Sequence, residues 1–213
     1  MSDIKYILFD AANTLIHKPM LWKNLQSSLK KFSHNVPEEL LKRNHKLLSE
    51  CLRFPDRTSK EFYLGFNSEL LYSLGISPTS ELLDEIFSSC TYLQWEKFSD
   101  TIIIDSIHLP CGIISNFNST LTEIINKEFG EKFKHILVSE NYGVVKPSLQ
   151  FYEIAANKIG FAPNEILYIG DSIKLDIEPA IKVSFNTLLI DRDNVYPIYI
   201  NRITSLEALT LYL

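Results

Sequence analysis

Five short segments of the chain are almost continuously apolar and rich in β-branched or aromatic residues. They are Lys5–Asp10, Cys111–Ser115, Ile136–Ser139, Ile166–Gly170 and Thr187–Asp191. Strands with one solvated face alternate apolar and polar residues, whereas strands of a parallel sheet are covered on both faces and do not. The sequence therefore predicts a parallel sheet buried between layers of helices.

Helical patterns separate the later strands. Thr120–Phe129 has apolar residues at helical spacing, and Thr120 with Glu123 matches a capping box. Ser148–Ile159 has a second apolar stripe and stops at Gly160. This alternation predicts an α/β fold, a doubly wound, Rossmann-like parallel sheet with right-handed crossovers.

The region between the first two predicted strands has almost no strand signal. Its apolar residues predict four helices, the second opened by Pro37 and the third by a capping box at Thr58 and Glu61. We expect a core formed by residues 1–18 and 96–213, with an all-helical domain, residues 19–95, inserted after the first strand. Ile102–Ile107 fits a helix or a strand equally well.

Composition excludes several classes of partner. The 213-residue chain is 46% hydrophobic, which suffices for a core, and its formal net charge is −5. This charge and the absence of a long Lys/Arg run argue against a nucleic-acid or anionic-membrane partner. The first strand leaves no room for a signal peptide, and no apolar run approaches ~20 residues. We expect a cytoplasmic protein, and the sequence does not indicate its oligomeric state.

Polar residues gather at the carboxyl ends of the predicted strands and in the loops that follow, which is where open α/β sheets bind ligands. They are Asp10, Thr14, Ser115, Asn116, Lys146, Asp171 and Asp176. Each alone could be a cap, a helix start or a surface charge. Three carboxylates at one edge, however, would repel each other without a cation, and oxygen ligands of this kind suit Mg²⁺. The hydroxyl, backbone N–H and Lys groups supply what a phosphoryl group requires.

Four motifs in a fixed order now become visible. They are FDAANTL at Phe9–Leu15, ISNFN at Ile114–Asn118, the lysine of VVKPS at Lys146, and YIGDSIKLD at Tyr168–Asp176. This set resembles the haloacid dehalogenase (HAD) superfamily, whose members are mostly Mg²⁺-dependent phosphohydrolases. The inserted helices match the position of its alpha-helical cap of the first type. The ISNFN and VKPSLQFYEIA segments look most like the branch named for the rhythmically expressed gene-two protein.

The resemblance implies a role for each matching residue. Asp10 would be the nucleophile and a metal ligand, and Ala12 would offer its backbone carbonyl to the metal. Asp171 would be the third protein ligand, with Asp176 supporting the metal directly or through water.

The phosphoryl group has its own implied partners. Thr14, Ser115 and the backbone of Asn116 would hold its oxygens. Lys146 would neutralise charge between Asp10 and the phosphoryl group.

The first motif departs from the DxDxT of family phosphatases, because Ala12 stands at the second position. The missing carboxylate would protonate the leaving group and activate water, which contributes about 10²–10⁴ in rate. We therefore expect either a phosphatase of small phosphorylated metabolites with impaired acid–base chemistry, or a catalytically impaired member that binds a phosphorylated ligand or a partner. His17, just past the motif, is a conceivable substitute acid.

Two other branches also fit an altered second position. Phosphonate-cleaving members have Ala there but require a Schiff-base lysine in the cap, and nothing singles out one of the lysines in that region. These lysines are Lys23, Lys30, Lys31, Lys42, Lys46 and Lys60. Haloacid dehalogenases expel halide without a proton, but they work without metal and lack the Asp that stands here as Asp171. We rank both below a phosphatase.

Overall fold

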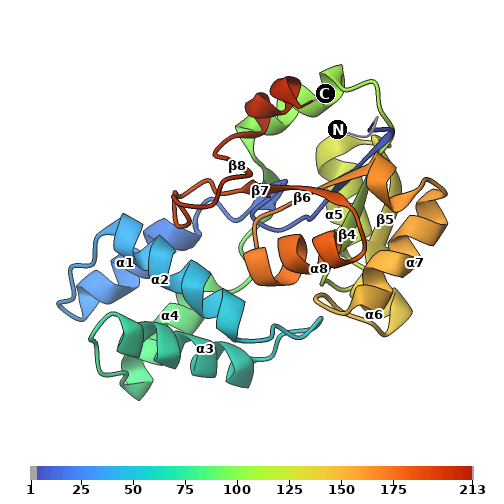
Figure 1. Cartoon of the computed structure of the whole chain (residues 1–213). Helices are drawn as coiled ribbons and strands as arrows, with labels where there is room; N and C mark the ends of the chain where they lie inside the picture. Colours follow the sequence, from blue (N-terminus) through green and yellow to red (C-terminus); the bar gives the residue numbers. More distant parts are fainter. Residues whose placement is uncertain (1–3, 213) are drawn as a thin grey trace. The chain divides into compact units, whose positions relative to one another are not determined.

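The computed structural model describes residues 4–212. The chain divides into two compact units, each treated separately below. We call the first the sheet unit; it contains the chain up to His17 and from Glu96 onward. The second, the helical unit, is Lys18–Trp95. Figure 1 shows both units and labels many of their helices and strands.

Six parallel strands form the main sheet of the sheet unit, in the order β5-β4-β1-β6-β7-β8 (Figure 1). Their bounds are β1 Tyr6–Phe9, β4 Cys111–Ser115, β5 Phe133–Val138, β6 Ile166–Gly170, β7 Asn186–Ile190 and β8 Arg202–Ile203. The chain winds outward from β1 to β5 and then returns to β6 on the other side of β1. The predicted doubly wound α/β fold is thus confirmed, and its switch point lies between β1 and β6.

Helices cover the two faces of this sheet. Tyr6 of β1 shares a core cluster with Phe151 of α7 (Leu149–Ile159) and with residues of α8 (Glu178–Lys182), and Figure 1 shows both helices on one side of the strands. Phe9 points to the opposite face, because its position differs from that of Tyr6 by an odd number of residues. Its ring contacts Phe133, which in turn contacts Phe129 of α5 (Leu121–Phe129). The sheet is therefore buried on both sides, as its apolar strands require.

Shorter elements complete the sheet unit. β2 (Ile16–His17) and β3 (Glu96–Lys97) pair as a two-stranded antiparallel sheet. The segment whose sequence fits helix or strand is a 3₁₀ helix, η1 (Ser99–Ser106). The others are α6 Ser139–Tyr142, η2 Pro163–Glu165, the π-helical turn η3 Ile173–Ile177, and η4 Leu206–Leu211.

The helical unit contains four helices in the regions where apolar spacing predicts them. They are α1 Leu21–Lys31, α2 Glu38–Cys51, α3 Lys60–Ser73 and α4 Ser80–Cys90. The buried leucines and isoleucines of this unit form one core, made of Leu25, Leu29, Leu41, Leu70, Leu71, Ile76, Leu82 and Ile86. Within residues 4–212, no helix has both the length and the apolar character needed to cross a membrane.

The two predicted capping boxes are wrong. Thr120 has a helical backbone, and its hydroxyl donates to Asn118 Oδ1 at 2.6 Å instead of capping α5. The cap of α3 is Ser59 rather than Thr58, because Ser59 Oγ accepts the bond from Phe62 N at 3.2 Å. In both places a nearby polar side chain, Asn118 or Ser59, makes the hydrogen bond that replaces the predicted cap. The spacing of the motif does not indicate this.

His45 in the helical unit makes the stability of the protein depend on pH. Its ring packs edge-on against Trp22 and Phe66, with centroids 5.1 and 4.9 Å away. Burial lowers the pKa of His45 to about 4, and the adjacent Lys46 acts in the same direction. The unfolded chain takes up this proton near pH 6.5, so stability should fall as the pH decreases from about 6.5 toward 4.

Replacing His45 by Phe should remove the contribution of this histidine to the pH dependence of stability. The loss of unfolding free energy between pH 7 and 5 should then be smaller by on the order of 1 kcal/mol. Urea unfolding of both proteins at the two pH values measures the difference. His108→Phe, at an exposed position, serves as the control. An equal pH dependence in the protein and in His45→Phe would show that the ring is protonated in the folded state.

Candidate active site

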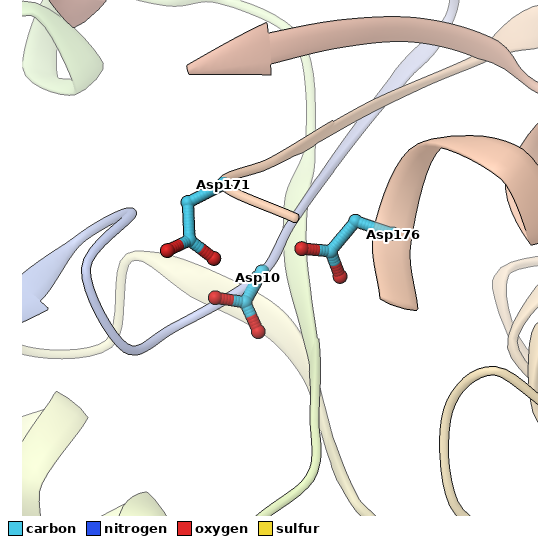
Figure 2. Close-up of side chains that lie close together, drawn as sticks. All are labelled: Asp10, Asp171 and Asp176. Atoms are coloured by element: carbon cyan, nitrogen blue, oxygen red, sulfur yellow. The ribbon is translucent and has the colours of Figure 1, made fainter. Parts of the chain in front are cut away.

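Three carboxylates from separate segments converge at the switch point of the sheet. Asp10 follows β1, Asp171 follows β6, and Asp176 lies in η3. Each offers an oxygen within 4.8 Å of those of the other two. Figure 2 shows the three carboxylates turned toward one another. Asp10 and Asp176 are buried and Asp171 is half-buried, so the sequence-based grouping of these residues matches their positions in space.

Lys146 ties two of these carboxylates together. Its Nζ lies 2.6 Å from Asp10 Oδ1 and 2.6 Å from Asp176 Oδ1, and its side chain is only 3% exposed. Burial alone would lower the pKa of Lys146, but the two carboxylates outweigh it and hold that pKa above its ordinary value. Lys146 is therefore a fixed positive charge inside the site.

The site carries more negative than positive charge. Burial raises the pKa of Asp10 to about 7; Lys146 opposes this shift, while Asp176 and Asp171 add to it. When all three carboxylates are ionised, the single ammonium leaves the site with a net negative charge, which a divalent cation would neutralise. Hard oxygen donors of this kind suit Mg²⁺. The donor set, Asp10, Asp171 and Asp176, therefore fits such an ion.

Two residues within the fourth motif, for which the resemblance implied no role, determine the position of Asp176. Tyr168 donates its hydroxyl to Asp176 Oδ1 at 2.7 Å, and Lys146 Nζ lies 3.3 Å from the same hydroxyl. Gly170 lies so close to Asp176 that a Cβ at that position would be 2.4 Å from Asp176 Cγ. A tyrosine in a fully apolar strand was the available signal, because a buried phenol needs a hydrogen-bond partner.

Two side chains from the end of β4 support the same cluster. Ser115 is buried, and its Oγ donates to Asp10 Oδ1 at 3.3 Å. Asn116 Nδ2 donates to the carbonyl of Lys146 at 2.9 Å, while its Oδ1 accepts from Lys146 N at 2.7 Å. The family resemblance implied a role only for the backbone of Asn116. Its side chain fixes the backbone of Lys146.

The loop after Asp10 contains a buried hydroxyl. Thr14 is fully buried, and its Oγ1 has no hydrogen-bond partner within residues 4–212. Buried hydroxyls are normally bonded, so this atom is suited to a ligand oxygen. Ala12, at the position of the missing carboxylate, is half-buried rather than enclosed.

The structure gives no support to His17 as a substitute acid. Its ring stacks on Phe98 with the centroids 4.0 Å apart. It also lines a cavity of about 620 Å³ together with Glu128 and Phe129, and the lining includes neither Asp10 nor Ala12.

Comparison with known proteins identifies the family of this chain. The profile of the haloacid dehalogenase-like hydrolases matches residues 4–183, and the chain belongs to this family of hydrolases. The closer resemblance to one branch of the family stays a prediction.

Curated relatives include proteins with two different chemistries. The (S)-2-haloacid dehalogenase of Pseudomonas putida is 28% identical over 127 residues, which are 57% of this chain and 55% of that protein. The glyceraldehyde 3-phosphate phosphatase of Methanocaldococcus jannaschii is 33% identical over 58 residues, 27% of this chain and 25% of that protein. The matches thus span about a quarter to about half the length of these relatives.

Solved structures show the same fold over the whole chain. The HAD-hydrolase YfnB of Bacillus subtilis, solved with bound magnesium, is 20% identical and has a TM-score of 0.68, covering 100% of this chain and 99% of that chain. The haloacid dehalogenase-like protein ATU0790 of Agrobacterium tumefaciens is 17% identical with a TM-score of 0.67, covering 98% and 97%.

The double ion pair of Lys146 should make this residue important for stability. Lys146→Met leaves two buried carboxylates without their counter-charge, and we expect it to reduce the free energy of unfolding by about 3–5 kcal/mol in metal-free buffer. Lys182→Met is the control, because it breaks only an exposed pair with Glu178 and should change stability little. Urea unfolding compares them, and similar losses in the two variants would contradict the buried-pair interpretation.

Proposed function

We propose that this hydrolase is a phosphatase of small phosphorylated metabolites in which Asp10 attacks phosphorus. The observation that carries the proposal is the position of Asp10, 2.6 Å from Lys146 Nζ and within 4.8 Å of Asp171 and Asp176. In the first step a carboxylate oxygen of Asp10 bonds to phosphorus, and the bond from phosphorus to the leaving oxygen breaks. Water then attacks the aspartyl-phosphate and releases phosphate.

The remaining residues bind and orient the phosphoryl group. The Thr14 hydroxyl, the Ser115 hydroxyl and the backbone N–H of Asn116 donate to its oxygens, and Lys146 neutralises charge between the group and Asp10. Mg²⁺, held by Asp10, the carbonyl of Ala12 and Asp171, with Asp176 directly or through water, supplies further neutralisation when bound.

Ala12 determines which leaving groups suit this site. No carboxylate at position 12 protonates the departing oxygen, so acyl phosphates, whose leaving group is already stable, react more readily than alkyl esters. The similarity to a glyceraldehyde 3-phosphate phosphatase supports a small phosphorylated substrate. The helical unit, in this proposal, is the cap whose side chains choose that substrate.

Ala12 also favours a second candidate, a catalytically impaired member that binds a phosphorylated ligand or a partner. A third candidate has support from the similarity to an (S)-2-haloacid dehalogenase, because halide leaves without a proton. The presence of Asp171 near Asp10 argues against the dehalogenase, because the family resemblance implies that dehalogenases have no Asp at this position.

Metal binding is testable without turnover. Mg²⁺ should raise the thermal midpoint of unfolding, because a ligand that binds only the folded state stabilises it. Asp171→Ala should lose most of this shift, whereas the control Asp105→Ala, at an exposed position, should keep it. A full Mg²⁺ response in Asp171→Ala would place the ion elsewhere.

Restoring the carboxylate tests the chemistry. Ala12→Asp should raise turnover of alkyl phosphate esters by about 10²–10⁴, and single-turnover attack on acyl phosphates by less. Ala12 is half-buried, which leaves space for the longer side chain. Ala12→Asn is the matched control: it has the same shape but no titratable proton, and it should gain nothing.

The outcomes separate the candidates. Rapid ester hydrolysis by the unaltered chain with no gain in Ala12→Asp would show that another residue is the acid. Tight binding of a phosphorylated ligand, with no turnover in either protein, would support the binding member. Release of halide from an (S)-2-haloacid would support the dehalogenase.

A further inference from the structure

The loop that follows Asp10 is a tight, strained turn. Leu15 N and Ile16 N both donate to the carbonyl of Ala11, at 2.8 and 3.0 Å, and Asn13 N donates to Ile16 O at 2.7 Å. Asn13 has a φ of 63°, in the left-handed region that non-glycine residues seldom adopt. Such a conformation persists where its surroundings hold it.

Arg192, just beyond the end of β7, holds this turn. Its Nη2 donates to the carbonyl of Thr14 at 2.8 Å and its Nε to that of Asn13 at 3.3 Å. Its guanidinium carbon lies 3.8 Å from the ring centroid of Phe98. The planar fork of a guanidinium reaches several acceptors at once, which a lysine ammonium does not reproduce.

The other edge of Arg192 is anchored to a second buried carboxylate. Nη1 lies 2.6 Å from Asp100 Oδ2, and the two side chains are 15% and 10% exposed. The same oxygen accepts from Ser205 Oγ at 3.1 Å and from Leu206 N at 2.8 Å. Asp100 is thereby fixed to the start of η4, so the guanidinium has little freedom to move away from the turn.

We propose that Arg192 is a positioning residue that sets the turn Ala11–Ile16, and with it the Thr14 hydroxyl and the Ala12 carbonyl, relative to Asp10. The inference rests on the proposed function for the use of these two groups, but not for the geometry itself. Thr14 Oγ1 has no hydrogen-bond partner within residues 4–212, so no side-chain bond there determines where it points. Its position therefore depends on the backbone that Arg192 binds.

Amide hydrogen exchange tests the geometry without any catalysis. In Arg192→Ala the amides of Asn13, Leu15 and Ile16, which close the turn, should exchange about tenfold faster or more, the loss expected when hydrogen bonds to a charged group are removed. Arg192→Lys should remain faster than the unaltered chain, because one ammonium does not span the same acceptors. It also keeps the charge beside Asp100, in case Arg192→Ala does not fold.

Arg202→Ala is the matched control. This arginine pairs with Asp191 at 3.2 Å, and its side chain is 21% exposed. Its side chain pairs with Asp191 rather than with the turn, so exchange in the turn should not change. Equal exchange in the turn for Arg192→Ala and the unaltered chain, or the same acceleration in Arg202→Ala, would overturn the inference.

Beryllofluoride with Mg²⁺ provides the second measurement. Binding should weaken about tenfold or more in Arg192→Ala and Arg192→Lys and stay unchanged in Arg202→Ala. Faster exchange with unaltered binding would mean that Arg192 only stabilises the turn, which overturns its positioning role. If the unaltered chain does not bind beryllofluoride, the proposed function fails, and the exchange data alone decide whether Arg192 sets the turn.

Discussion

The buried ion pairs of Lys146 with Asp10 and Asp176 are the interaction on which the rest of the site depends. Burying charges is unfavourable unless each is paired with good geometry. Both contacts are 2.6 Å, and Tyr168 adds a hydrogen bond to the same oxygen of Asp176. Asn116 fixes the lysine backbone. One ammonium thus joins β1, η3 and the segment before α7 at a single point.

Much of this arrangement is predictable from the sequence. Asp10 and Asp171 lie at the carboxyl ends of apolar strands, and parallel strands bring these ends to one edge of the sheet. Lys146 and Asp176 are identified by their motif spacing rather than by any strand. The doubly wound sheet follows from the lack of alternation in those strands.

The residues that escape prediction are those with no sequence pattern that indicates their contacts. Tyr168 and Gly170 read as ordinary strand residues, and their importance comes from the approach of Asp176. Arg192 looks like a surface charge until the turn after Asp10 is folded against it. The two capping boxes are local patterns, and they fail for local reasons. Ser59 caps α3 in place of Thr58, and the hydroxyl of Thr120 donates to Asn118 instead of capping α5. The spacing of residues does not show which of several nearby side chains will cap a helix.

The pairing of β2 with β3 has a consequence for the evolution of such chains. Ile16 pairs with Lys97 and His17 with Glu96, so the backbone leaves the sheet unit and re-enters it at neighbouring positions. An insertion between two such positions adds little strain to the sheet, whatever its length, since its two ends are already closed. Recombination at the paired ends of β2 and β3 can therefore exchange the inserted helices, while the carboxylates and Lys146 keep their positions. Selection can then act on the two parts at different rates.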